Sequence, residues 1–229
     1  MVKRKQIERN RRNVFLEEHF IGDASLGGSN SVFVATSGTG AQVTNTASAS
    51  EVDRPGIARL LTGSGTATNT NWALMRISNT INFGGNNAWD LHFIFRMASV
   101  MPTLTENYII RLGFGDSLSG SSAPVDGIYL SFDASNTELM WNVVSNGTLA
   151  QVASGVVPAQ WTWYFCTIDV AQTFATCSIN GTVRSMPLAN VPRGTGRDTG
   201  INFGVTKSAG ISLSAMIDID YFSMLGQLA

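Results

Sequence analysis

Apolar and polar side chains alternate along much of this chain, and the pattern is clearest between residues 161 and 184. A period of two is typical of a half-buried β-strand, because successive side chains point to opposite faces of a sheet. The residues that would share the buried face are Tyr164, Cys166, Ile168 and Val170 in a first strand and Ala175, Cys177 and Ile179 in a second. Asn180-Gly181 follows and favours the positive backbone dihedrals of a tight hairpin turn. The stretch therefore predicts two paired strands and one further chain reversal.

Short apolar segments separated by Gly, Asn, Asp, Ser or Pro continue through the rest of the chain. The expected strands are 13–21, 72–77, 80–83, 91–97, 108–114, 128–133, 139–144, 151–153, 163–170, 174–179, 201–205 and 216–224, with shorter islands at 31–35, 41–43 and 57–61. No helix longer than a turn is expected after residue 13. Many short strands without interleaved helices predict an all-β, antiparallel sandwich or barrel.

The length and composition fit one β domain. A chain of 229 residues with 44% hydrophobic residues can bury a sizeable core, and all-β sandwiches of this size are often single domains. Charged residues make up only 14% of the sequence, below the roughly 25% of average soluble domains. A surface with so few charges is typical of a protein that lies within an assembly. We divide the chain into an N-terminal arm, 1–13, and a β-sandwich domain, 14–229.

The arm is strongly basic, whereas the rest of the chain is acidic. Its basic residues are Lys3, Arg4, Lys5, Arg9, Arg11 and Arg12, against the single acid Glu8. The arm therefore carries a net charge of +5, and the remainder carries −6. Its composition favours a short helix, marginal on its own. Such an arm indicates docking to an acidic partner surface, with these six residues as contacts, and weak contact with nucleic acid is the alternative. Sequence-specific nucleic-acid binding is not expected, because no aromatic residue interleaves the basic ones.

Neither a secretory leader nor a membrane span is expected. The basic start is followed by polar residues instead of an apolar segment. No apolar run approaches the roughly 18 residues that a bilayer span needs. We therefore expect synthesis in a cytoplasm and no membrane partner.

Five segments carry a resemblance to a known family. They are 89–96 (WDLHFIFR), 111–116 (RLGFGD), 126–133 (DGIYLSFD), the 161–181 hairpin and 217–222 (IDIDYF). In this order they resemble the concanavalin A-like jelly roll of the laminin G type, which recurs in bacteriophage tail, fibre and capsid-surface proteins. The resemblance implies two antiparallel sheets packed face to face, with residues 17–21 near 217–222. It also implies a homo-oligomer, usually a trimer, and Trp161 and Trp163 lie where a neighbouring subunit could pack.

The resemblance also implies candidate sites for calcium and for sugars. Domains of this type often bind Ca²⁺ at a rim through loop oxygens, and Asp116, Asp126 and Asp133 are the candidate ligands, although Asp beside Gly is also common in turns. Sugar binding needs an exposed aromatic ring flanked by amides. Trp141 with Asn142 and Asn146, and Trp72 with Asn69 and Asn71, fit that description. Most tryptophans are nevertheless expected in the core or at interfaces.

Catalytic constellations are not evident in the sequence, and we expect a protein that is not an enzyme. Glycoside hydrolysis needs two carboxyl groups about 5 to 5.5 Å apart in retaining enzymes. The nearest approach is Asp218 with Asp220, interpreted as outward polar positions that alternate with Ile217, Ile219 and Tyr221. His19 and His92 lie inside predicted strands, which favours sheet packing. No phosphate-binding loop precedes a helix.

The two cysteines allow two interpretations. Both point inward in the predicted hairpin, so they are expected to be small buried hydrophobic residues, with a cross-strand disulfide as the alternative. If the connection is centred on Ala171 and Gln172, Cys166 lies opposite Cys177. Zinc binding by two thiols without a nearby histidine is not expected.

The preferred functional hypothesis is a bacteriophage virion structural protein, such as a capsid decoration, head-fibre or tail component. Its arm would insert into a capsid or tail protein, and its jelly roll would project outward. One alternative is a receptor-binding lectin for host surface polysaccharide. A second alternative, ranked last because paired carboxyl groups are missing, is a glycan depolymerase.

Overall fold

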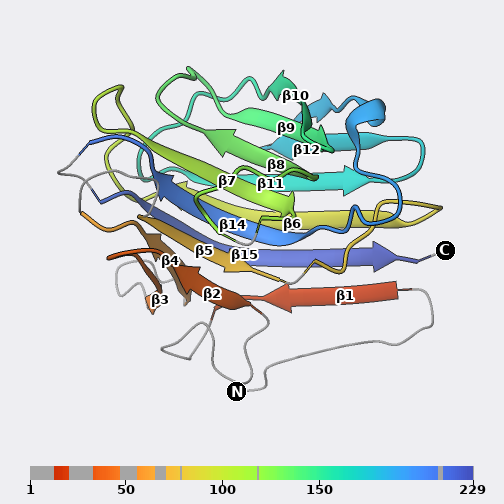
Figure 1. Ribbon diagram of the computed structural model, residues 1–229, viewed down its shortest axis with the longest axis horizontal. Helices are drawn as coiled ribbons and strands as arrows, with labels where there is room; N and C mark the ends of the chain where they lie inside the picture. Colours follow the sequence, from red (N-terminus) through yellow and green to blue (C-terminus); the bar gives the residue numbers. More distant parts are fainter. Residues whose placement is uncertain are drawn as a thin grey trace.

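The computed structural model describes residues 13–20, 33–46, 56–64, 71–77, 79–117, 119–210 and 214–228. Within these ranges the chain forms two antiparallel sheets that lie one over the other (Figure 1). One turn of 3-10 helix, η1 (Leu188–Asn190), is the helical structure among them. None of this helical structure has the length and apolar character that a bilayer crossing requires. The all-β, two-sheet jelly-roll prediction is confirmed.

The eight-stranded sheet contains both ends of the described chain. Its order is β13 (Thr182–Ser185), β12 (Ala175–Ile179), β11 (Trp163–Val170), β6 (Ala88–Met97), β15 (Met216–Gln227), β4 (Ile57–Leu61) and β3 (Gln42–Thr46), with β1 (Asn13–Glu18) paired to β15. Glu18 lies opposite Phe222 in the β1–β15 pair. The predicted neighbourhood of the first and last strands is therefore confirmed.

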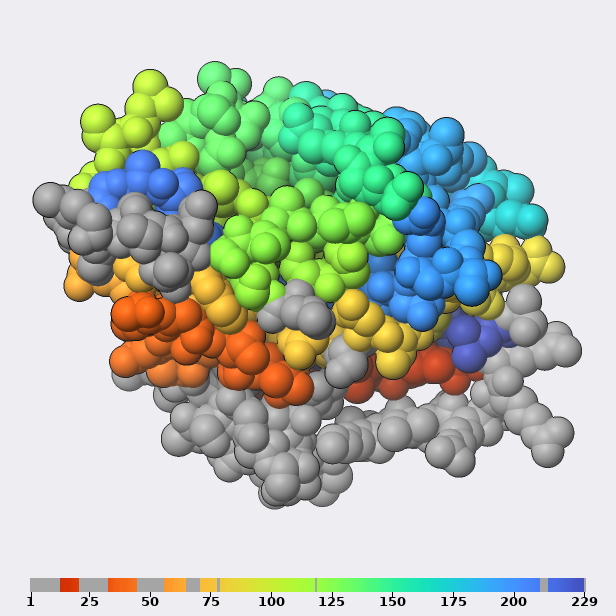
Figure 2. Space-filling view, in the orientation of Figure 1, coloured from red at the N-terminus to blue at the C-terminus, as the bar shows by residue number. Residues whose placement is uncertain are grey.

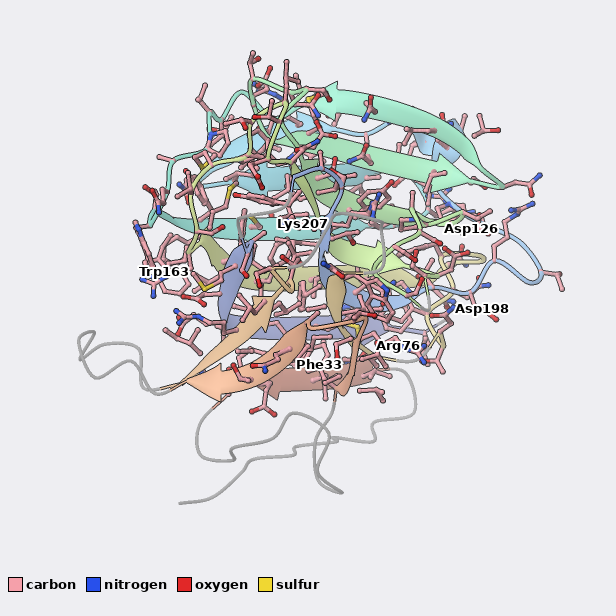
Figure 3. The ribbon with its side chains drawn as sticks, turned by 60° about the vertical axis from the view of Figure 1, so that its left-hand side comes forward. Phe33, Arg76, Asp126, Trp163, Asp198 and Lys207 are labelled. Carbon is pink, nitrogen blue, oxygen red and sulfur yellow. The ribbon has the colours of Figure 1, made fainter. Side chains whose placement is uncertain are left out.

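The seven-stranded sheet covers the other side of the core. Its order is β10 (Thr148–Ala153), β9 (Met140–Ser145), β8 (Gly127–Phe132), β7 (Tyr108–Gly115), β14 (Gly200–Lys207), β5 (Trp72–Arg76) and β2 (Val34–Ser37). Figure 2 shows the molecule from this side. Along the sandwich, Asp126 and Asp198 lie at one end and Trp163 at the opposite end (Figure 3). The predicted strand at 80–83 is reduced to a single bridge between Ile81 and Thr199.

The core lies between the two inner faces and is rich in aromatic side chains. Phe33 meets Phe222 edge to face with ring centroids 4.7 Å apart, and Phe93 packs against Phe203 at 5.3 Å. Trp141 is completely buried among them in the same core cluster. Each such side chain stabilises the fold by roughly 1.5–3 kcal/mol through burial. Because the core takes every second residue of a strand, it also fixes which side chains stand on the outer faces.

A β-bulge changes the alternation in β15. The register against β6 shifts between Ile219 and Tyr221, so that Phe222, and not Tyr221, continues the buried face of Ile217 and Ile219. The sequence interpretation that placed Tyr221 in phase with the two isoleucines is therefore wrong. A bulge adds one residue to a strand and reverses the facing of all later residues.

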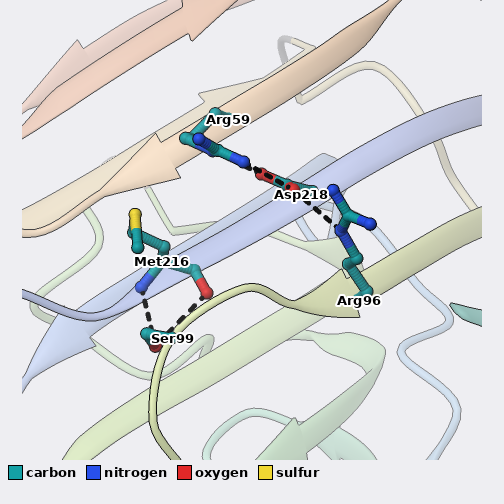
Figure 4. A network of polar contacts seen from close by, with 5 residues as sticks. All are labelled: Arg59, Arg96, Ser99, Met216 and Asp218. Carbon is teal, nitrogen blue, oxygen red and sulfur yellow. Dashed lines mark hydrogen bonds and ion pairs between the residues drawn. The ribbon is translucent and has the colours of Figure 1, made fainter. Parts of the chain in front are cut away.

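Asp218 is buried completely instead of standing at an outward, solvated position. Its Oδ1 accepts a hydrogen bond from Arg59 Nε at 2.7 Å, and its Oδ2 accepts one from Arg96 Nε at 2.9 Å (Figure 4). Cross-strand register places both arginines directly beside it, on β4 and β6. The carboxylate thus joins three neighbouring strands across the outer face of the eight-stranded sheet.

The hairpin of β11 and β12 has the predicted strands but a different register. Val170 pairs with Ala175, so the connection contains four residues, and Cys166 lies opposite Ile179 while Cys177 lies opposite Ile168. The expectation that the cysteines face each other is wrong by two residues. Because side chains alternate with a period of two, a register shift of two residues keeps both cysteine side chains on the inner face. Both cysteines are free and buried, and the predicted Asn180-Gly181 turn joins β12 to β13.

Residues 1–12 of the N-terminal arm lie outside the described residues. This holds for its predicted helix and for the six basic residues proposed as partner contacts. Asn13 is the first described residue, and it already pairs with Gln227 at the start of β1.

Replacing Asp218 with asparagine should lower the free energy of unfolding by about 3 kcal/mol, because two arginines would lose a buried counter-charge. Urea denaturation measures this change. Asp198→Asn is the control, since Asp198 is exposed and its loss should cost less than about 1 kcal/mol. Equal losses for the two variants would show that the buried network does not stabilise the fold.

Neither cysteine should react with a thiol reagent at pH 8 in the native protein, and both should react in denaturant. Burial raises the pKa of Cys166 and of Cys177, so little thiolate is present in either. Absorbance-based counting of thiols before and after unfolding measures this. Fewer than two reactive thiols per chain in denaturant without reductant would instead indicate a disulfide.

Candidate functional site

Outward side chains of β7 to β10 form a polar surface on the seven-stranded sheet. Cross-strand register places Arg111 beside Ser131, and it places Tyr129, Asn142 and Gln151 in one row across three strands. We call these five residues the polar face. Figure 2 looks onto this side of the molecule, with β7 to β10 in green.

Hydrogen bonds fix the amides of the polar face. Gln151 Nε2 donates to Asn142 Oδ1 at 2.8 Å, and Asn142 Nδ2 donates to Ser131 Oγ at 2.7 Å. Asn142 is only 1% exposed, whereas Gln151 is exposed. The buried amide therefore acts as a fixed support that orients Gln151 and Ser131 on the surface.

Arg111 is a largely desolvated cation with no ion pair in the part of the chain that the structure describes. Its Nη1 donates a hydrogen bond to the carbonyl oxygen of Gly120 at 3.2 Å. Desolvation lowers the pKa of Arg111, and the charges of Tyr129 and Asp133 oppose that shift. A guanidinium removed from water without a counter-charge is unfavourable, so a bound anion would stabilise it.

Tyr129 stands next to this cation as a neutral phenol. Burial raises the pKa of Tyr129, and the positive charge of Arg111 acts in the opposite direction. Its cross-strand neighbour is Gly113, which has φ +141° and carries no side chain. A Cβ there would fall 2.7 Å from the carbonyl oxygen of Ile128, so the position tolerates only glycine. On the β7 side the Tyr129 ring therefore has no cross-strand side chain, whereas on the β9 side it has Asn142. Tyr129 as a whole is 6% exposed.

The loop between β7 and β8 lies against this face. Thr206 Oγ1 donates a hydrogen bond to the same Gly120 carbonyl that Arg111 contacts. A Cβ on Gly120 would fall 2.8 Å from the Cβ of Trp72, so the glycine packs directly on that residue. Asn202 Nδ2 donates to the Ser117 carbonyl oxygen at 3.3 Å. These contacts hold the loop beside Arg111.

Two further polar atoms on the same outer face have no partner. Arg76 and Asn202 are cross-strand neighbours on β5 and β14. Arg76 Nε and Asn202 Oδ1 are both buried and make no hydrogen bond. Such groups are unusual in folded proteins and mark places where water or a ligand can bind.

The predicted sugar-binding tryptophans do not form exposed platforms. Trp141 is wholly buried and cannot stack on a ligand. Trp72 is half-buried under Gly120, and Asn71 is buried beside it. Asn142 does belong to the polar face. Asn146 occupies the β9–β10 turn at φ +52°.

Arg111 and Tyr129 are not evident as site residues from the sequence. Both lie in the segments that carry the family resemblance, where the pattern indicates only strand positions. The available signal was a lone arginine in the apolar run of 108–114, at a position that alternation assigns to the outer face.

The three predicted calcium ligands do not converge. Asp126 Oδ1 accepts a hydrogen bond from the Asn146 amide at 2.8 Å and pairs with Arg197 at 3.0 Å, while Asp116 bonds within its own loop. Asp133 lies at the opposite end of the six-residue β8, about 20 Å away. Across the described ranges, no group of three His, Cys, Asp or Glu residues could hold a metal ion.

The histidines are located on the outer face of the eight-stranded sheet and not in the core. His92 Nε2 lies 2.9 Å from Asp90 Oδ2, and this contact raises the pKa of His92. His19 lies 3.3 Å from Glu17 Oε1 and packs on the Tyr221 ring at 4.7 Å between centroids. The prediction of a strand position is correct for His92 in β6, whereas His19 directly follows the end of β1. Both side chains are partly exposed.

Taken together, the geometry defines a concanavalin A-like jelly roll with a polar, arginine-containing outer face. Residues 53–220 match the family described as SO2946-like, C-terminal domain, and the chain belongs to this family. No match was found among curated proteins.

Solved structures support the same fold. The chain is similar to SO2946 from Shewanella oneidensis MR-1, a protein of unknown function, with TM-score 0.63, 14% identity and coverage of 95% of this chain and 87% of that one. Lectin UEA-II in complex with galactose gives TM-score 0.57 and 9% identity, covering 95% and 100% of the two chains. The carbohydrate esterase vb_24B_21 from the Shiga toxin-encoding bacteriophage phi24B gives a TM-score of 0.53 and 12% sequence identity. The match covers 93% of this chain and 100% of that one. At these identities the likeness establishes the fold alone.

Proposed function

We propose that this protein is a lectin-like, non-enzymatic module that binds an acidic saccharide on the polar face. The observation that carries this proposal is Arg111, a desolvated guanidinium that forms no ion pair with any described residue and is surrounded by groups that suit sugar hydroxyls. A saccharide that bears a carboxylate offers both an anion for Arg111 and hydroxyl groups for the other residues of the polar face.

The carboxylate would pair with Arg111. Guanidinium and carboxylate form two parallel hydrogen bonds, and such charge-assisted bonds are stronger than neutral ones. One N–H of Arg111 is already used by Gly120, which leaves the remaining donors of the fork for the ligand. The contact to Gly120 also restricts the side chain before binding, which reduces the entropy cost of complex formation.

The hydroxyl groups would bind to the rest of the polar face. Ser131 and Gln151 each offer a donor and an acceptor, and the Asn142 amide holds both in place. Tyr129 adds an aromatic ring beside the side-chain-free position of Gly113. These are the few oriented polar groups on a rigid scaffold that a specific ligand site requires.

A binding role is favoured over catalysis by the composition of this face. The polar face contains no carboxylate, whereas glycoside hydrolysis uses a pair of them. The similar structures include a lectin with galactose and a carbohydrate esterase, so this fold hosts both activities and does not decide between them. Release of oligosaccharides from a polysaccharide by the purified protein would refute the non-enzymatic assignment.

We further propose that the module functions on a bacteriophage particle and attaches through the basic arm. The sequence supports this through the +5 charge of the arm and the sparsely charged domain. Similarity to a phage-encoded protein of the same fold is consistent with it. In this setting the polar face would contact host surface polysaccharide, and the arm would contact an acidic capsid or tail protein.

Arg111→Gln should weaken binding of a uronic-acid oligosaccharide at least tenfold, because glutamine keeps hydrogen-bonding capacity but removes the charge. Isothermal titration calorimetry with a uronic-acid oligosaccharide and a neutral one of equal length measures this. Binding of the acidic ligand should also weaken as salt is raised.

Arg193→Gln is the matched control for Arg111→Gln. Arg193 is also partly buried and bonds backbone carbonyls, but it lies in the loop before β14, where it contacts Ala171 and Gln172. The control should bind like the wild type. Equal affinity of Arg111→Gln and wild type, or no binding of either oligosaccharide, would refute the proposed function.

Removal of residues 2–12 should abolish incorporation into particles and leave the jelly roll folded. Complementation of a phage that lacks this gene product, followed by protein analysis of purified particles, measures incorporation, and circular dichroism measures folding. Substituting the six basic residues with glutamine should have the same effect, because charge is the proposed determinant. Normal incorporation of either variant would contradict the attachment role.

A further inference from the structure

Large hydrophobic side chains are exposed on the outer face of the eight-stranded sheet. Five of them lie on or beside this face, namely Phe15, Trp161, Phe165, Val183 and Leu225. Trp161 and Phe165 are 52% and 53% exposed. Grouped apolar side chains at the surface of a folded domain commonly mark an interaction site.

An apolar stripe crosses the middle of this face at right angles to the strands. Register places Phe165 of β11 beside Ile94 of β6, and Ile94 beside Tyr221 of β15. His19 continues the row by packing on the Tyr221 ring. We call these four residues the apolar stripe.

The two sides of the apolar stripe differ in charge. On one side, Arg59 and Arg96 flank the buried carboxylate of Asp218, and the Arg59 side chain is 29% exposed whereas that of Arg96 is 8% exposed. On the other side stand Asp90, Asp169 and Glu17, with His92 bonded to Asp90. A partly exposed cation therefore lies on one side and three carboxylates lie on the other.

Asp90 and Asp169 form an unfavourable pair within the monomer. They lie directly opposite each other on β6 and β11, and like charges in that arrangement repel. Burial and the charge of Asp90 raise the pKa of Asp169. A cation from a partner would relieve this repulsion.

We propose that this face binds a second copy of the same chain through a two-fold axis that runs along the apolar stripe. That rotation places each apolar stripe on its counterpart. It also turns Arg59 of each copy, whose side chain is 29% exposed, toward Glu17 of the other. A surface that is complementary to itself in this way fits an isologous dimer.

Trp161 supports an interface role for this end of the face. Its backbone has φ +62°, a conformation that bulky side chains rarely adopt. The Arg96 guanidinium lies 5.1 Å from the Trp161 ring centroid and 4.4 Å from that of Trp163. Tryptophan and arginine held against each other are frequent energetic centres of protein interfaces.

The proposal differs in symmetry from the trimer that the family resemblance implies. A face that complements itself by a two-fold rotation closes as a dimer, whereas a three-fold ring needs two different surfaces. The oligomeric state in solution therefore tests the argument directly. It is independent of the proposed saccharide site, which lies on the opposite sheet.

Sedimentation equilibrium of the full chain should show a concentration-dependent dimer that weakens as salt is raised. Phe165→Asp should weaken dimerisation at least tenfold. Asp169→Lys should also weaken it, although the monomer should unfold no more easily, because the repulsion with Asp90 is removed. Loss of association without loss of stability distinguishes an interface effect from misfolding.

Val34→Asp is the control, because Val34 is equally exposed but stands on the outer face of the seven-stranded sheet. This variant should dimerise like the wild type. A protein that stays monomeric at high concentration, a trimer, or a dimer that Phe165→Asp leaves intact would each overturn the proposal. Acidic-saccharide binding by Phe165→Asp should be unchanged, so failure of one proposal remains distinguishable from failure of the other.

Discussion

The contact between the inner faces of the two sheets is the interaction on which the rest of this structure depends. Phe33, Phe93, Phe203 and Phe222 meet there, and burial of this aromatic surface is the main favourable term for a domain with few charges. Each strand contributes every second residue to this contact. The residues in between must therefore point to the outer face of their sheet. Arg111 stands on the outer face because Ile110 and Leu112 are required inside.

The two outer faces have diverged within that constraint. The seven-stranded sheet presents amides, a phenol and an unpaired guanidinium, whereas the eight-stranded sheet presents an apolar stripe between opposite charges. On the eight-stranded sheet the Asp218 carboxylate is buried, which is unfavourable for an isolated charge. Hydrogen bonds from two arginines compensate for this burial. We therefore propose a polar ligand for one sheet and another protein surface for the other.

Strand alternation and turn chemistry were sufficient to predict an all-β sandwich or barrel and the Asn180-Gly181 turn. The two-sheet jelly roll and the neighbourhood of β1 and β15 were implied by the family resemblance. Features that are set by tertiary packing could not be predicted in this way. The β11–β12 loop has four residues instead of two, which nothing in its composition indicates, and the bulge in β15 has no marker in the apolar pattern.

The candidate site was less predictable than the fold. Trp141 and Asn142 are adjacent in sequence, but alternation sends the indole into the core and the amide to the polar face. The alternation along one strand separates its two faces but does not show which face is buried. That depends on how the neighbouring strands and the second sheet pack against it. Similarly, the lack of an ion pair between Arg111 and any described carboxylate is a property of three dimensions and has no equivalent in the sequence.

Chemical-shift mapping of isotope-labelled protein with a uronic-acid oligosaccharide tests the central assignment most directly. The account predicts that saturating ligand shifts the backbone amides of Tyr129, Ser131 and Gln151 and leaves those of Ile94 and Phe165 unchanged. Shifts centred on the eight-stranded sheet, or no shifts at millimolar ligand, would contradict it.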